Sequence, residues 1–391
     1  MTAHFTIGIE EEFQTVDRSA GHLCAQIQHI LEKGNPIFGE QIKAEILQPT
    51  VELISGILPD IPTARNELRL ARAKLAQLVG DEGLALISAG THPGAHWQDQ
   101  ARSPYERYAQ LEEEFQDVAR HLLIFGLHTH IGVENQQVAV VLMNQLRTWL
   151  PHLLAISTNS PFWSGRVTGL KSYRSAVWKS FLRTGIPEVF ASWYDFDNYV
   201  QMLIKTGCID NGKRIWWDIR PHPFFSTIEF RICDMPATLD DTIAIAALCQ
   251  ALVAKLDWLY RHGLSAPMIS SHFIEENKWH AMRFGLDAEV LDFVQGRRLS
   301  MRESLHELLD FVADVSDDLG SHHEIDYLRS LLESPRGTGA DRQIALYQQT
   351  GSIDAVTQLL MDQTMQGIPL GAPVEEATCS SRGSICLTNV L

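Results

Sequence analysis

The segment FTIGIEEEFQTV, residues 5–16, decides the fold because its side chains alternate in character with period two. One set is apolar: Phe5, Ile7, Ile9 and Phe13. The alternate set is small or polar: Gly8, Glu10, Glu12 and Gln14. Because successive side chains of a strand point to opposite faces of a sheet, the segment predicts a strand with one face against a core and carboxylates on the other.

Three more segments predict strands that combine an apolar face with a polar one: residues 43–54, 126–133 and 227–233. His128 and His130 share a parity, as do Glu229 and Arg231, so each pair points to one face. The four strands together place glutamates, histidines and an arginine where they can meet.

Residues 43–54 present a problem of parity, because Glu45 and Glu52 fall on opposite faces of a regular strand. A bulge or break at Pro49 returns both carboxylates to one face. Otherwise one of the two lies outside the site.

Helical periodicity fills much of the remaining chain. Predicted helices cover residues 60–80, 103–126 and 136–157, then most of the chain from 238 onward, with clear patterns at 301–315 and 353–366. Strands among helices without strict βαβ alternation predict an α+β protein, an antiparallel sheet with helices packed on its outer face. We expect one domain over residues 1–370 and a disordered tail over 371–391, where the periodicity is lost.

Composition limits the partners. The chain has 391 residues and a formal net charge of −16, which argues against general nucleic-acid binding but not against a nucleotide ligand. The apolar stretch 242–259 contains Gln250, Lys255 and Asp257, which favours a buried helix over a membrane span. The first residues lack a signal-peptide pattern and the six cysteines form no C-x-x-C pair, so we expect a cytoplasmic protein with reduced thiols.

Carboxylates gathered on one sheet face need a compensating cation, because burying an unpaired charge is costly. Oxygen ligands with an imidazole favour Mg²⁺ or Mn²⁺ over Zn²⁺. Arg231 beside them suits a phosphate oxygen and the charge that develops in phosphoryl transfer. Neither a G-x-x-x-x-G-K-[ST] loop nor a strand-linked G-x-G-x-x-G is present, so ATP, if it binds, is held in another way.

Simpler interpretations stay open on the residues alone. An E-E-E run is typical of a solvated edge, H-x-H of a structural pair, and E-x-R of a cross-strand ion pair. Two functional alternatives also remain. One is a metal-dependent amide hydrolase with Zn²⁺ or Mn²⁺, and the other is a non-catalytic protein that binds ATP or an amino acid.

The motifs together resemble the bacterial type-2 glutamate–cysteine ligase family of carboxylate–amine ligases. In chain order they are GIEEEF (8–13), QPTVE (48–52), SAGTHP (88–93), GLHTHIGV (126–133), TNSPFWSG (158–165), SYRS (172–175), RPHP (220–223), IEFR (228–231), NKWHAMRFGLDA (277–288) and GTGADRQ (337–343). The resemblance implies a curved antiparallel sheet of the glutamine synthetase/guanido kinase type, helices outside it, and a single catalytic domain.

The resemblance also implies a reaction. ATP, with Mg²⁺ or Mn²⁺, would phosphorylate a glutamate-like carboxylate, and an amine would then displace the phosphate to give a γ-glutamyl amide. Weak glutamate–cysteine ligase activity and a homodimer are expected, while the natural carboxylate and amine are left open.

The resemblance also implies a role for each residue that matches a family motif, and the following assignments are what we expect from it. The metal ligands are Glu10, Glu12, Glu52, Glu229 and His128, to which the strand pattern adds Glu45. The catalytic residues are Glu229 and Arg231, and the nucleotide-binding residues are Arg231, His128 and Arg342. The expected substrate-binding residues are His130, Arg174 and Arg283; the two arginines are chosen because a guanidinium pairs well with a carboxylate.

Overall fold

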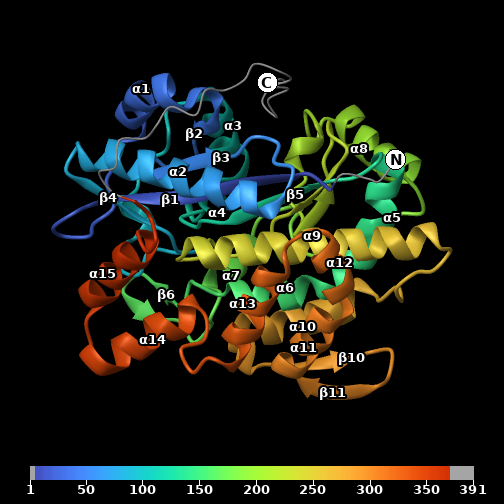
Figure 1. Cartoon of the computed structure of the whole chain (residues 1–391). Coiled ribbons are helices and arrows are strands. Elements are labelled where there is room, and N and C mark those ends of the chain that lie inside the picture. Colours follow the sequence, from blue (N-terminus) through green and yellow to red (C-terminus); the bar gives the residue numbers. More distant parts are fainter. Residues whose placement is uncertain (1–4, 370–391) are drawn as a thin grey trace.

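A seven-stranded antiparallel sheet forms the centre of the computed structural model, which describes residues 5–369 (Figure 1). Its strands are β1 (Ile7–Asp17), β2 (Ile42–Ala44), β3 (Thr50–Ile54), β4 (Leu84–Ile87), β5 (Leu127–Gly132), β8 (Ile219–Pro221) and β9 (Thr227–Phe230). The order is β2-β3-β1-β5-β9-β8, with β4 paired to the end of β1. The predicted α+β class with an antiparallel sheet is confirmed.

Helices make up most of the remaining described chain. They are α1 (Ile27–Phe38), α2 (Ile61–Gly80), α3 (Glu106–Phe115), α4 (Asp117–Arg120), α5 (Gln136–Leu146), α6 (Leu150–Ser157), α7 (Tyr173–Lys179), α8 (Trp193–Lys205), α9 (Leu239–Arg261), α10 (Ser271–Phe284), α11 (Met301–Phe311), α12 (Ala313–Asp318), α13 (His322–Glu333), α14 (Gly339–Thr350) and α15 (Ile353–Thr364). Two small hairpins accompany them: β6 (Phe162–Trp163) with β7 (Arg166–Val167), and β10 (Glu289–Asp292) with β11 (Arg297–Ser300).

The packed face of the sheet lies against α2 and α9, and α9 crosses the middle of the molecule (Figure 1). Ile7, Ile9 and Phe13 of β1 are buried on this side. By length and hydropathy α9 resembles a membrane span, but 83% of its most apolar window is buried inside the protein. The helix is therefore a core element that supports the strands from behind.

The predicted strand over 43–54 is wrong as a single strand. β2 and β3 form an antiparallel hairpin that places Lys43 opposite Glu52. In its turn, the backbone N–H of Thr50 donates to the carbonyl of Leu47 at 3.1 Å. The break predicted at Pro49 falls in this turn, and it reverses the chain instead of bulging one strand.

The predicted helix start at Ser103 is also wrong. The Ser103 hydroxyl donates to the backbone carbonyl of Glu45 at 2.5 Å, so it ties the β2–β3 turn and caps no helix. The helix begins only at Glu106, and Gln116, with φ of 49°, breaks the expected segment into α3 and α4. Strands β4, β6, β7, β8, β10 and β11 were not predicted, because strands of two to four residues show little periodicity.

The single-domain assignment over 1–370 stays a prediction, and the predicted tail at 371–391 lies outside the described residues.

Candidate active site

Strand register brings the predicted polar residues to one face of the sheet. Glu12 lies opposite Glu52, and Glu10 lies opposite His128. Continuing across the sheet, His130 lies opposite Glu229, and Glu229 lies opposite Arg220 of β8. Because directly opposed residues of antiparallel strands share a face, these side chains form one continuous polar surface.

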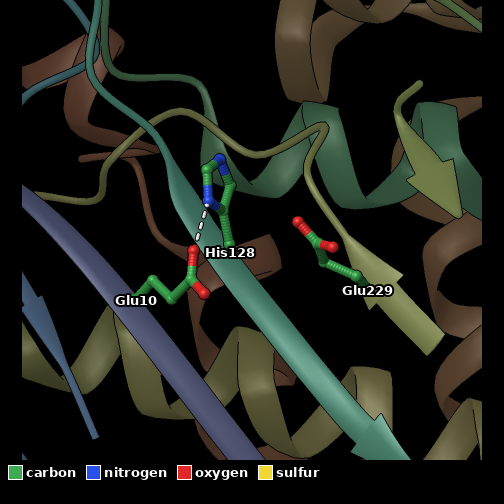
Figure 2. Close-up of side chains that lie close together, drawn as sticks. All are labelled: Glu10, His128 and Glu229. Atoms are coloured by element: carbon green, nitrogen blue, oxygen red, sulfur yellow. Dashed lines mark hydrogen bonds and ion pairs between the residues drawn. The ribbon is translucent and has the colours of Figure 1, made fainter. Parts of the chain in front are cut away.

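Glu10 is held between two imidazoles. Its carboxylate contacts His128 Nδ1 at 2.9 Å and His130 Nε2 at 3.1 Å, and Figure 2 shows it reaching from β1 to His128 on β5. Burial favours the protonated form of Glu10, but His130 and His128 outweigh it and hold its pKa well below the usual range. Burial opposes protonation of His130, but the charges of Glu229 and Glu10 prevail and raise its pKa. Glu10 and His130 therefore form an ionic contact at the centre of the polar face.

Glu229 is held by two arginines. Arg220 donates through Nε at 2.7 Å and through Nη2 at 3.1 Å, and Arg231 Nη1 donates to the same carboxylate. Burial alone would raise the pKa of Glu229, yet Arg220 and Arg231 hold it well below the usual value. Sequence reasoning missed Arg220, although it opens the RPHP motif; the three-residue strand β8 gave no pattern that would aim it at Glu229.

Glu12, Glu45 and Glu52 repel one another at the other end of the face. Burial, followed by the charge of Glu45, raises the pKa of Glu12 to about 8. Burial, followed by Glu10, Glu45 and Glu12, raises the pKa of Glu52 well above its usual value. The hairpin turn returns Glu45 to the face of Glu52, and burial raises the pKa of Glu45 as well. Among residues 5–369, no lysine or arginine forms an ion pair with these three carboxylates, and more distant arginines offset their charge only in part.

Within residues 5–369, two sets of side chains are placed so that they could hold a metal ion. Glu10, His128 and Glu229 offer ligand atoms within 4.8 Å of one another, and so do Glu12, Glu52 and His128. Nε2 of His128 is buried and has no hydrogen-bond partner among residues 5–369. Burial and the charge of Arg231 lower the His128 pKa to about 4, so the imidazole is neutral and able to act as a ligand. The oxygen-rich donor set and the carboxylate repulsion fit a hard divalent cation.

Arg174, predicted to bind substrate, lies near Gly126 and Glu12. Its guanidinium is buried and donates to the carbonyls of Ile232 at 3.2 Å and Arg231 at 3.1 Å. Its charge lowers the pKa of Glu12 in part. A Cβ on Gly126 would approach Nη2 of Arg174 to 2.3 Å, so a larger residue there would have to displace the guanidinium.

Arg342 and Arg283 have other partners. Arg342 Nη2 pairs with Asp241 at 3.0 Å, at the start of α9. Arg283 packs over the ring of Phe284, with 4.7 Å from its guanidinium carbon to the ring centre. The nucleotide and substrate roles predicted for these two arginines stay predictions.

Comparison with solved structures places the fold. A glutamate–cysteine ligase from Francisella tularensis in complex with AMP superposes with a TM-score of 0.70 at 13% sequence identity, covering 95% of this chain and 91% of that chain. A bifunctional glutathione synthetase from Pasteurella multocida gives 0.66 at 15% identity, over 93% of this chain and 53% of that one. These likenesses show that the sheet and its helices have the architecture of such ligases.

Sequence comparison is more specific. A Solibacter usitatus protein provisionally named glutamate–cysteine ligase 2 is 47% identical over 364 residues, which are 93% of this chain and 94% of that protein. The family model for glutamate–cysteine ligase family 2 matches residues 6–359.

Fold, site and relatives together define an ATP-dependent ligase that forms carbon–nitrogen bonds. Within that class, the chain belongs to glutamate–cysteine ligase family 2.

Proposed function

We propose that this ligase uses ATP to phosphorylate the side-chain carboxylate of a glutamate-like amino acid and joins the activated carbonyl to an amine. The products are a γ-glutamyl-type amide, ADP and phosphate. The observation that carries the proposal is the arrangement of two carboxylate–histidine sets beside Arg220 and Arg231 on one sheet face. Such a face suits phosphate moving from one oxygen to another, because cations and guanidinium donors converge where negative charge accumulates.

Glu10, Glu229 and His128 would hold one Mg²⁺ or Mn²⁺, and Glu12 with Glu52 would hold another beside the same histidine. Bound there, the ions would neutralise charge on the ATP phosphates and the transferring group. The raised pKa values of Glu12 and Glu52 support this assignment, because a cation would offset both the burial and the neighbouring negative charges that raise them.

Arg231 would contact the transferring phosphoryl group. Only Nη1 of its guanidinium donates to Glu229, and Nε is buried without a partner in the described part of the chain. Arg220 binds the same carboxylate with two donors, so Glu229 stays ionised and aligned when Arg231 binds phosphate. Arg220 is thus a positioning residue, and Arg231 supplies the free donors.

Substrate and nucleotide contacts complete the proposal. Arg174, Arg283 and His130 would hold the glutamate-like carboxylate substrate, and Arg342 would join Arg231 and His128 at the nucleotide. His130 has the best support, because it contacts Glu10 at 3.1 Å on the polar face. An alanine at Arg283 or Arg342 would raise KM for the carboxylate or for ATP, respectively, with little change in kcat.

The test is ADP release from ATP with a panel of amino acids and amines, including glutamate with cysteine. We expect release only when both substrates are present, and a fall of about 10²–10³-fold in Glu229→Gln and Arg231→Ala. Glu289→Gln and Arg298→Ala are matched controls, because these residues pair with each other on the exposed β10–β11 hairpin. Full turnover in both site variants would refute the assignment, and amide cleavage without ATP would favour a hydrolase.

A cytoplasmic location and a homodimer remain part of the proposal. Fractionation of the source cells and light scattering of the purified chain test them.

A further inference from the structure

Two histidines of this chain lie in the same kind of turn. His92 and His222 are each followed by proline, in the SAGTHP and RPHP motifs. The ring Nδ1 of each accepts the backbone N–H groups of the residues two and three positions further on. The distances are 3.1 and 3.0 Å from Gly94 and Ala95, and 3.2 and 3.1 Å from Phe224 and Phe225. A ring nitrogen that accepts hydrogen bonds carries no proton, so each ring is neutral and its proton is on Nε2.

The two histidines differ in what their Nε2 atoms contact. Nε2 of His92 donates to the backbone carbonyl of Gly21 at 2.9 Å, so its last hydrogen-bonding group is used inside the fold. Nε2 of His222 has no hydrogen-bond partner among residues 5–369, although only 7% of His222 is exposed. It is not one of the unpaired atoms that the protein fully encloses, so part of its surface is accessible. The turn at His92 therefore serves the fold, whereas the turn at His222 leaves a donor unused.

His222 lies on the polar face of the sheet. Its backbone N–H donates to the carbonyl of Thr227 at 2.9 Å, which extends the pairing of β8 with β9 by one residue beyond Pro221. His222 has the same parity as Arg220, so the two side chains point to the same face. The rings of His222 and His130 meet edge to face, with their centres 5.7 Å apart. The unused donor is therefore next to the residues of the candidate active site.

The orientation of the His222 ring is fixed before any ligand binds. Phe225 stacks on it with ring centres 4.6 Å apart and an angle of 17° between the planes. The two hydrogen bonds to Nδ1 prevent rotation within that plane. A donor held in this way loses little conformational freedom when it binds a ligand.

The charges at this end of the polar face favour an anionic oxygen as the acceptor. Arg220 and Arg231 share the single carboxylate of Glu229, so their positive charge exceeds its negative charge. The opposite end of the face holds the glutamates with raised pKa values. The phosphates of a nucleotide carry several anionic oxygens, and N–H groups form strong hydrogen bonds to such oxygens.

We propose that His222 is a nucleotide-binding residue of this ligase and that its Nε2–H donates to a phosphate oxygen of ATP. The inference rests on the proposed ATP-dependent function and adds a contact from the end of β8 to those of Arg231, His128 and Arg342.

NMR of the full chain with nitrogen-15-labelled histidine tests the contact without turnover, because no amino acid or amine is added. His92 and His222 should both show the proton on Nε2. Adding Mg²⁺–ATP should shift the Nε2 resonance of His222, while that of His92 stays in place because its donor remains bonded to Gly21. The resonance that is lost in His222→Asn identifies His222.

His222→Asn also removes the donor while keeping the turn, because Oδ1 of asparagine can accept the two backbone N–H groups in place of Nδ1. Calorimetry should show Mg²⁺–ATP binding about tenfold more weakly, with the melting temperature unchanged. His92→Asn is the matched control, since it makes the same replacement in the same kind of turn. It loses the bond to Gly21, so its melting temperature should fall and its affinity for Mg²⁺–ATP should stay as in the wild type.

The outcomes separate this inference from the proposed function. Mg²⁺–ATP binding without a shift at His222, or with equal affinity in His222→Asn, would overturn the contact and leave the ligase proposal standing. A shift on adding glutamate but not on adding Mg²⁺–ATP would place the donor at the carboxylate substrate and would also overturn it. A wild-type chain that does not bind Mg²⁺–ATP would refute the proposed function, and the contact with it.

Discussion

Adjacent glutamates of β1 point to opposite faces of the sheet and have different partners there. Glu11 points to the packed face, where Arg72 of α2 contacts both of its carboxylate oxygens, with Nη2 at 2.5 Å. Arg72 also donates to Thr242 of α9 at 3.1 Å, and both members of the ion pair are buried. Glu10 and Glu12 point to the polar face, where strand register surrounds them with histidines and further carboxylates.

The difference lies in where the compensating charge comes from. Glu11 has a permanent counter-charge inside the fold, so its role is structural. Glu12 and Glu52 have little compensation from the chain itself, and their pKa values are raised by burial and by neighbouring carboxylates. A face that leaves charge uncompensated fits the proposed cation sites, at some cost in stability without the cation.

Removing Arg72 should destabilise the packed face of the sheet, and we expect this change to have the largest effect of all those predicted. Arg72→Met leaves Glu11 buried and unpaired, so we expect a loss of about 3–5 kcal/mol in unfolding free energy, measured by urea denaturation. The double variant Glu11→Leu with Arg72→Met should recover most of this loss, because no charge remains buried. A loss below about 1 kcal/mol in the single variant would show that the ion pair contributes little.

Removing a carboxylate from the polar face should lower activity without lowering stability. Glu52→Gln should lower ADP release about 10²–10³-fold. The melting temperature without metal should stay equal or rise, because the variant no longer buries an ionisable carboxyl group beside Glu10, Glu45 and Glu12. Glu276→Gln, at an exposed position of α10, is a control for amide substitution. A destabilised Glu52→Gln would mean that Glu52 supports the fold as Glu11 does.

The sequence predicted which polar side chains share a face, but it did not predict which cationic residues offset the charges of the glutamates. Period two placed Glu10, Glu12, His128 and Glu229 on polar faces, and register confirms that they share one face. The same pattern left Glu11 unexplained on the apolar side. Its partner Arg72 is 61 residues away, and a contact between distant segments leaves no local signal.

The positions of Glu45 and Arg220 could not be predicted, because each is set by a short turn or strand. The β2–β3 turn decides the face of Glu45, and a three-residue strand aims Arg220 at Glu229. A pattern of this length is too short to be distinguished from a loop. The fold class and the acidic centre were therefore predictable, whereas the arginine support and the hairpin required the structure.

The pH dependence of stability should separate the two faces. Glu12 has a folded pKa raised to about 8, so its stability contribution is complete below its unfolded value near 4.5 and is lost as pH rises toward 8. With chelator present, the unfolding free energy should fall over this interval, by at most about 1.4 kcal/mol per pH unit for one group. Glu12→Gln should flatten this slope, and Mg²⁺ should oppose the loss in the wild type. An identical slope in Glu12→Gln would exclude Glu12 as its source.

The smallest expected effect concerns Glu45, which tests how far the uncompensated charge extends. Glu45 shares the face of Glu52, but neither three-residue ligand set includes it, and Arg107 partly offsets its charge. We expect Glu45→Gln to lower ADP release only about three- to tenfold, chiefly by reducing the negative potential at the cation bound by Glu12 and Glu52. The dependence of the rate on Mg²⁺ concentration is the decisive measurement, because a distant carboxylate changes the apparent affinity more than the maximal rate. A loss as large as that in Glu52→Gln, not recovered at saturating Mg²⁺, would make Glu45 a direct ligand and extend the metal site into the β2–β3 turn.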